Sequence, residues 1–204
     1  MQIDDTARST RPTLTDIMRK RFSGVLDPIA AFIGRLGVTP NMLTITGLVG
    51  NFVGAVFLSQ GRFLTGGLIV LFMGPLDALD GALARLHGES SKFGAFVDSV
   101  TDRYSELFIF AGLMVHYLKA EDWLWAGVVY AAAAGSVLVS YARARAESLA
   151  YDARGGIFTR AERFAVLIPS LIFNFPHVGI ALVAVFANFT ALQRIYDVRR
   201  QARL

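Results

Sequence analysis

Four aspartates recur at helical spacing inside an otherwise apolar part of the sequence. They lie in residues 77–102, DALDGALARLHGESSKFGAFVDSVTD, which apolar residues flank on both sides. A carboxylate at the centre of a membrane-spanning helix costs about 2.5–3.5 kcal/mol on insertion scales, so such residues usually mark a functional site. The four are Asp77, Asp80, Asp98 and Asp102.

The spacing of these aspartates places them on two helix faces. Along a helix, the first two stand at positions i and i+3 and the last two at i and i+4, so each pair shares one face. Small residues on the same faces would let a neighbouring backbone or a flat ligand approach closely. These are Gly81, Ala84 and Gly94. Because the loop at 86–92 is short, we expect the two helices to be antiparallel neighbours with opposed acidic faces.

Carboxylates that converge in one cavity repel one another unless cations neutralise them. An all-oxygen ligand set without His or Cys favours a hard cation such as Mg²⁺, Mn²⁺ or Ca²⁺ over zinc. Two ions bridged by shared carboxylates would balance the four negative charges. Such a site clamps a pyrophosphate and stabilises the leaving group of a phosphoryl displacement.

Other interpretations of the acidic cluster stay open at this point. The aspartates could form buried ion pairs with Arg85 and Arg103, although two arginines cannot neutralise four acids. They could instead line the cation pathway of a transporter, but transporters usually spread intramembrane charges over more helices. A lipid-binding scaffold without catalysis is a third alternative.

The composition indicates a membrane protein. Of the 204 residues, 54% are hydrophobic, and the mean hydropathy is +0.48, which is too apolar for an ordinary soluble domain. No strand-like alternation appears, so we expect a single all-α domain over residues 13–204 after a disordered N-terminus at 1–12. Six stretches are predicted to cross the bilayer: 41–59, 63–86, 93–118, 122–144, 160–175 and 177–197.

Charge placement predicts the orientation of this polytopic domain. An amphipathic helix from Thr13 onwards, with basic residues beside its apolar stripe, is expected to lie in the membrane interface. Most Lys and Arg residues lie before the first span, in the second and fourth connections, or after the last span, whereas Arg62 and Lys119 fall on the other side. The positive-inside rule therefore places both termini and the acidic cluster on the cytoplasmic side of the plasma membrane.

The start of the first span carries a second polar motif. Pro40 suits an early helical position, and Thr39 or Asn41 can cap the free amide groups there. Helix N-termini also bind phosphate, so a ligand-binding interpretation competes with the cap. Thr44 lies one turn inside the helix.

The complete pattern D-x2-D-G-x2-A-R-x8-G-x3-D-x3-D resembles the signature of the CDP-alcohol phosphotransferase family. These membrane enzymes move a phosphoalcohol or phosphatidyl group from a CDP carrier to an alcohol, and six spans with an interfacial helix also fit them. The resemblance implies that the four aspartates hold two ions of Mg²⁺ or Mn²⁺, that Asp102 is the catalytic base, and that the protein is a homodimer. It also implies a set of residues that bind CDP-diacylglycerol: Thr39, Pro40, Asn41, Thr44, Gly81, Ala84, Arg85 and Ser91.

Three further segments are similar to the branch of this family that makes phosphatidylinositol phosphate from CDP-diacylglycerol and inositol 1-phosphate. They are Asp102-Arg103, SYARARAE at 140–147 and RAER at 160–163. Arg143 departs from that branch, which usually has lysine there, so glycerol 3-phosphate is the second candidate acceptor.

Arginines near the cytoplasmic face are the candidate acceptor-binding groups. Guanidinium groups bind phosphate through two parallel hydrogen bonds, so four arginines are predicted to hold the acceptor phosphate: Arg143, Arg145, Arg163 and Arg194. Positive-inside topology and contact with lipid head groups are the alternative explanation for any one of them. Membrane lipids are the other expected partners, and no nucleic acid is expected.

Overall fold

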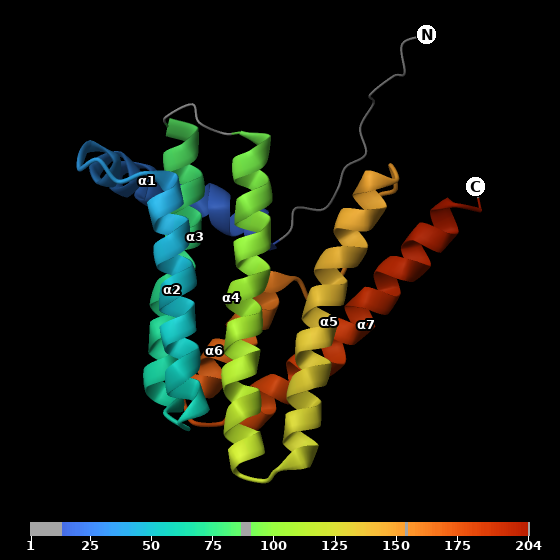
Figure 1. The fold of residues 1–204 in the computed structure, drawn as a ribbon. Helices are drawn as coiled ribbons and strands as arrows, with labels where there is room; N and C mark the ends of the chain where they lie inside the picture. Colours follow the sequence, from blue (N-terminus) through green and yellow to red (C-terminus); the bar gives the residue numbers. More distant parts are fainter. Residues whose placement is uncertain (1–13, 87–90, 154, 204) are drawn as a thin grey trace.

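The computed structural model describes residues 14–86, 91–153 and 155–203. Every regular element in these residues is an α-helix, which confirms the predicted all-α class (Figure 1). The helices are α1 (Leu14–Arg35), α2 (Pro40–Ser59), α3 (Phe63–Leu86), α4 (Lys92–Lys119), α5 (Trp123–Ser148), α6 (Arg160–Ile172) and α7 (Pro176–Gln201). The N-terminal segment predicted to be disordered lies outside the described residues.

Local capping explains where several helices begin. Thr39 accepts a hydrogen bond from the Met42 amide at 3.3 Å, and Pro40 is the first residue of α2. Ser91 accepts one from the Gly94 amide at 2.9 Å at the start of α4. Such caps satisfy amide groups that have no partner inside the helix. Because the signals are local, the predicted boundaries of these two helices agree with the structure to within one residue.

Four helices are long and apolar enough to cross a membrane: α2, α3, α5 and α7. α4 does not meet that criterion, since it carries several charged residues, and α6 has only 13 residues. The structure therefore supports a multi-pass membrane protein, whereas the count of six spans stays a prediction. A helix is present where an interfacial one was expected, as α1, but its placement in the interface also stays a prediction.

Small residues bring the helices together. A Cβ atom at Gly112 of α4 would lie 2.3 Å from the carbonyl oxygen of Ala55 in α2, so only glycine allows this crossing. At the contact between α5 and α7, a Cβ atom at Gly135 would lie 2.6 Å from Nδ2 of Asn188. Close backbone approach is the usual means of helix association in membranes. The main apolar core is built from side chains of all the helices from α2 to α7.

The two helices that carry the acidic residues share a third helix as their neighbour. α3 and α4 run antiparallel, as predicted, but in the described part of the chain α2 is the principal packing partner of both (Figure 1). The antiparallel arrangement is therefore confirmed, and α2 makes the main contacts with both helices. Like-charged faces repel, whereas the apolar, glycine-containing α2 can pack closely against each helix. This arrangement keeps the acidic faces apart.

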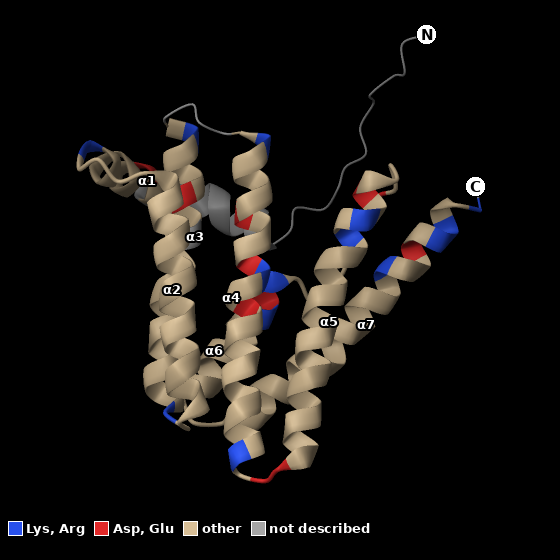
Figure 2. Cartoon of the chain, in the orientation of Figure 1, with Lys and Arg blue, Asp and Glu red and all other residues tan. Residues whose placement is uncertain are grey.

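Charge is distributed unevenly along the helices. Figure 2 shows charged residues at the upper ends of α3, α4, α5 and α7 and in the middle of α4, with long uncharged stretches below them. The middle of α4 holds Asp98, Asp102, Arg103 and Glu106. Charged residues within an otherwise apolar bundle usually belong to a functional site. This part of α4 is therefore the place to look for one.

Candidate active site

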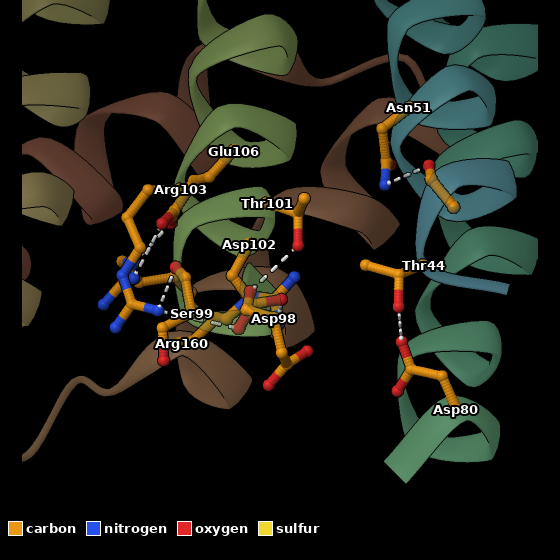
Figure 3. A network of polar contacts seen from close by, with 12 residues as sticks. Thr44, Asn51, Asp80, Asp98, Ser99, Thr101, Asp102, Arg103, Glu106 and Arg160 are labelled. Carbon is orange, nitrogen blue, oxygen red and sulfur yellow. Dashed lines mark hydrogen bonds and ion pairs between the residues drawn. The ribbon is translucent and has the colours of Figure 1, made fainter. Parts of the chain in front are cut away.

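Four helices contribute polar side chains to one region of the molecule (Figure 3). Thr44 comes from α2, Asp80 from α3, Asp98 and Asp102 from α4, and Arg160 from α6. The side chains from α4 and α6 lie on one side of this region, and Thr44 and Asp80 lie on the other. The fold thus brings together residues from the two predicted motifs.

A hydrogen bond connects the motif at the start of α2 with the acidic motif. The Thr44 hydroxyl donates to Oδ2 of Asp80 at 2.7 Å and also lies 3.1 Å from the carbonyl oxygen of Pro40. Asp80 is only 5% exposed. The hydrogen bond from Thr44 therefore helps to stabilise a carboxylate that is buried. Sequence reasoning assigned Thr44 to nucleotide binding and missed its role as a partner of Asp80.

The carboxylates of α4 have different surroundings. Asp98 is exposed, and the neighbouring Thr101 hydroxyl lies within 3.0 Å of its backbone carbonyl. Asp102 has an arginine at each oxygen: Nη1 of Arg160 lies 2.6 Å from Oδ1, and Nη1 of Arg103 lies 3.8 Å from Oδ2. Arg103 was considered as a partner from the sequence, but the closer partner is Arg160, from a distant segment.

The donor chemistry of this region fits a hard divalent cation. The described side chains supply carboxylate and hydroxyl oxygens, with no histidine or cysteine among them. The Arg160 guanidinium already places a positive charge 2.6 Å from the Asp102 carboxylate. A cationic partner therefore fits beside this carboxylate. Among the described residues, no three acidic or histidine side chains form a ready-made metal cluster. The side chain of Asp77 lies outside the described residues, so the complete four-aspartate ligand set stays a prediction.

Other residues predicted to bind CDP-diacylglycerol lie at the ends of α2, α3 and α4. Asn41 is exposed in the first turn of α2, after the Thr39 cap. On α3, Ala84 is partly buried and Arg85 is exposed, and a Cβ atom at Gly81 would lie 3.5 Å from Nη1 of that arginine. The Ser91 hydroxyl oxygen is the N-cap of α4. Their contact with the nucleotide stays a prediction.

The four arginines predicted to hold the acceptor phosphate fall into two groups. Arg143 and Arg145 are exposed at the end of α5, where Arg143 pairs with Glu147 at 2.9 Å. Arg194 is 2% exposed and donates to the carbonyl oxygens of Gly155 at 3.0 Å and Val139 at 2.5 Å. Arg163 is also buried and is bound by a carboxylate from α4. The structure therefore buries two of these guanidinium groups and exposes the other two, and their contact with the acceptor phosphate stays a prediction.

Arg163 forms a bidentate ion pair with Glu106. Its Nε lies 2.7 Å from Oε1 and its Nη2 lies 2.9 Å from Oε2, while Nη1 donates to the Phe158 carbonyl at 3.4 Å. The two side chains are 2% and 7% exposed. Sequence reasoning did not single out Glu106, although an acidic residue one turn after Asp102 in an apolar helix was an available signal.

We expect Arg163→Met to destabilise the protein strongly, because it leaves the Glu106 carboxylate buried without its counter-charge. Removing one member of a buried pair typically costs about 3–5 kcal/mol. The free energy of unfolding can be measured by SDS titration of the detergent-solubilised protein, followed by circular dichroism. The double variant Glu106→Gln/Arg163→Met should recover part of the loss.

The exposed pair of Arg143 and Glu147 is the matched control for this measurement. Its members are 46% and 43% exposed, so Arg143→Met should cost no more than about 1 kcal/mol. Equal losses for the two single variants would show that the buried pair has no special importance for stability. A variant of Arg163 with normal stability and a selectively raised KM for the acceptor would instead support the phosphate contact predicted from the sequence.

Comparison with known proteins identifies the family. The family model described as CDP-alcohol phosphatidyltransferase matches residues 37–192, a range that includes both motifs and the site residues on α2, α3, α4 and α6. The chain therefore belongs to the CDP-alcohol phosphatidyltransferase family and is a transferase, as the resemblance predicted.

Relatives and solved structures are similar over nearly the whole chain. The archaetidylinositol phosphate synthase of Pyrococcus horikoshii is 36% identical over 190 residues, with 92% of this chain and 97% of the relative covered. The phosphatidylinositol phosphate synthase of Streptomyces avermitilis is 34% identical over 216 residues, covering 96% and 88%. The crystal structure of the Mycobacterium tuberculosis phosphatidylinositol phosphate synthase with CDP-DAG bound has a TM-score of 0.79 at 31% identity, covering 86% of this chain and 94% of that one. A structure of the same synthase with manganese and citrate has a TM-score of 0.78 at 31% identity, covering 86% and 89%.

Proposed function

We propose that this protein transfers the phosphatidyl group of CDP-diacylglycerol to inositol 1-phosphate and releases CMP. The observation that carries this proposal is the joining of the two motifs, in which Thr44 of the first binds Asp80 of the second. The relatives named above add support for the acceptor, because their names specify different lipids but share inositol phosphate. Phospholipid synthesis is the corresponding process.

The reaction is a displacement at the phosphorus that carries diacylglycerol. A hydroxyl oxygen of the acceptor forms a new bond to that phosphorus, the bond from phosphorus to the bridging oxygen breaks, and CMP leaves with that oxygen. Asp102 accepts the proton of the attacking hydroxyl. Asp102 on α4 and Asp80 on α3 lie on opposite sides of the site (Figure 3). This arrangement supports a base on α4 beside carboxylates that would face the pyrophosphate.

Two divalent ions, Mg²⁺ or Mn²⁺, would be held by Asp77, Asp80, Asp98 and Asp102 and would neutralise charge on the pyrophosphate and the leaving CMP. The nucleotide would lie along the ends of α2 and α3, between the motif that begins at Thr39 and the residues that follow Asp80. The exposed arginines of α5 would attract the acceptor phosphate. For the two buried arginines, the contacts support a different function, namely holding α6 and the loop before it in place.

We place the protein in the plasma membrane with six spans, its active site and both termini on the cytoplasmic side. In this arrangement α4 and α6 cross together with the four apolar helices, and α1 lies in the interface. Charged residues gather at the upper ends of the helices in Figure 2, with fewer at the lower turns, which supports an upper cytoplasmic side. A homodimer is the proposed assembly.

An acceptor panel tests the proposed activity. Purified full-length protein is incubated with labelled CDP-diacylglycerol and Mn²⁺, and CMP release is measured with inositol 1-phosphate, glycerol 3-phosphate, inositol or no acceptor. We expect release to depend on inositol 1-phosphate, because a phosphorylated acceptor matches the arginines at the end of α5. Stimulation by glycerol 3-phosphate alone would make the protein a phosphatidylglycerophosphate synthase.

Three further outcomes would reject the transferase proposal as a whole. CMP release that no acceptor stimulates would exclude both acceptors. Cation flux in proteoliposomes without CMP formation would identify a transporter. Binding of CDP-diacylglycerol without turnover would identify a lipid-binding scaffold.

A further inference from the structure

Two ion pairs connect α6 to α4 in matching register. On α6, Arg160 and Arg163 are three residues apart, and on α4 Asp102 and Glu106 are four residues apart, so each pair of residues shares one helix face. The two arginines bind the two acids in the same order along the helices. We call these contacts the outer pair, Arg160 with Asp102, and the inner pair, Arg163 with Glu106.

The two pairs differ in burial and in geometry. The inner pair has two hydrogen bonds between its partners, and its side chains are 2% and 7% exposed. In the outer pair, Nη1 of Arg160 lies 2.6 Å from Oδ1 of Asp102, and the side chains are 31% and 17% exposed. Opening the inner pair would leave two charges in an apolar interior, which is very costly. The outer pair is the more exposed of the two, so opening it costs less than opening the inner pair. It is therefore the exchangeable one.

The outer pair also involves a carboxylate of the candidate metal site. The guanidinium of Arg160 lies against Oδ1 of Asp102, and its carbon lies 5.2 Å from the centre of the Phe164 ring. If a divalent cation bound the Asp102 carboxylate, the cation and the Arg160 guanidinium would both lie against that one carboxylate. Such like-charge proximity is unfavourable for both.

We propose that Arg160 is an internal competitor of the divalent cation: it neutralises Asp102, and a cation that binds this carboxylate must displace it. The inner pair holds α6 in register with α4, so the displaced guanidinium stays close to the site. This inference rests on the proposed metal site and adds a residue that controls how tightly the site binds its ion. Arg160 thus acts on the metal site through Asp102, whose carboxylate it holds until the cation binds.

The test is the Mn²⁺ affinity of purified full-length protein in detergent, measured from the free Mn²⁺ signal in electron paramagnetic resonance. Arg160→Gln removes the competing charge and keeps polar atoms beside Asp102. We expect it to bind Mn²⁺ about two- to fivefold more tightly than the unaltered protein, the size of effect that a partly exposed charge pair exerts. Unchanged or weaker binding by a folded Arg160→Gln protein would overturn the proposal.

Two other substitutions make the result specific. Arg103→Gln removes the same formal charge from α4, but this arginine lies 3.8 Å from the other oxygen of Asp102 and is more exposed, so its effect on Mn²⁺ affinity should be smaller. An equal gain would show a general effect of net charge and would overturn the competition. Arg160→Lys keeps a positive charge with fewer hydrogen bonds, and its Mn²⁺ affinity should lie between those of the unaltered protein and Arg160→Gln. If Arg160→Gln does not fold, an Arg160→Lys affinity at or below that of the unaltered protein would overturn the proposal.

A failure of this inference can be told apart from a failure of the metal site itself. Asp98→Asn should abolish saturable Mn²⁺ binding if the proposed ligands hold the ion. Loss of binding in Asp98→Asn together with no gain in Arg160→Gln would reject the competition and leave the metal site standing. Binding that Asp98→Asn does not change would reject the proposed ligand set.

Discussion

Asp98→Asn should abolish phosphatidyl transfer while the protein remains folded. Asp98 is exposed in the candidate site on α4, one turn before Asp102, and we propose that it is shared by the two ions. Loss of a shared ligand should disable both ions, so we expect turnover to fall to background even at saturating Mg²⁺. CMP release from labelled CDP-diacylglycerol measures this loss, and circular dichroism with gel filtration reports the fold.

Asp122→Asn is the matched control for this substitution. Asp122 is the N-cap of α5, where its Oδ1 accepts a hydrogen bond from the Trp125 amide at 3.2 Å. Asparagine also serves as an N-cap, so the control removes one carboxylate charge without removing the cap, and activity should persist. Near-normal turnover of Asp98→Asn at saturating metal would show that the ligand assignment is wrong.

Asp102→Asn should separate proton transfer from binding. Asparagine keeps the size of the side chain and one oxygen but cannot accept the proton, and general-base assistance contributes about 10²–10⁴ in rate. The substitution also removes the ion pair with Arg160 and Arg103, so this region loses one negative charge beside two arginines. We expect single-turnover transfer to fall by about that factor, while CDP binding in the presence of Mg²⁺ weakens only modestly.

Measuring CDP binding and single-turnover transfer on one preparation distinguishes the possible functions of this residue. If CDP binding disappears together with transfer, Asp102 is chiefly a metal ligand and another group accepts the proton. If transfer survives, the acceptor hydroxyl needs no protein base. Only slow transfer with retained binding supports the assignment of Asp102 as the base.

The sequence determined the parts of this protein that depend on local pattern. Apolar length and helix-start residues predicted the helices, because capping and burial of an apolar segment act within a few residues. The intervals between the aspartates predicted which ones share a face, since helical periodicity alone decides that. The same intervals, together with the fixed glycine, alanine and arginine positions, were specific enough to indicate the family.

Contacts between distant segments were decided only by the tertiary structure. The position of α2 as the shared neighbour of α3 and α4 depends on close approaches such as that of Gly112 to Ala55, which no single segment encodes. The partners of Arg160, Arg163 and Arg194 come from other helices or loops. An arginine beside a membrane can bind phosphate, lipid or a buried carboxylate. The pattern RAER is compatible with all three, and only packing against α4 supplied Asp102 and Glu106 as the partners.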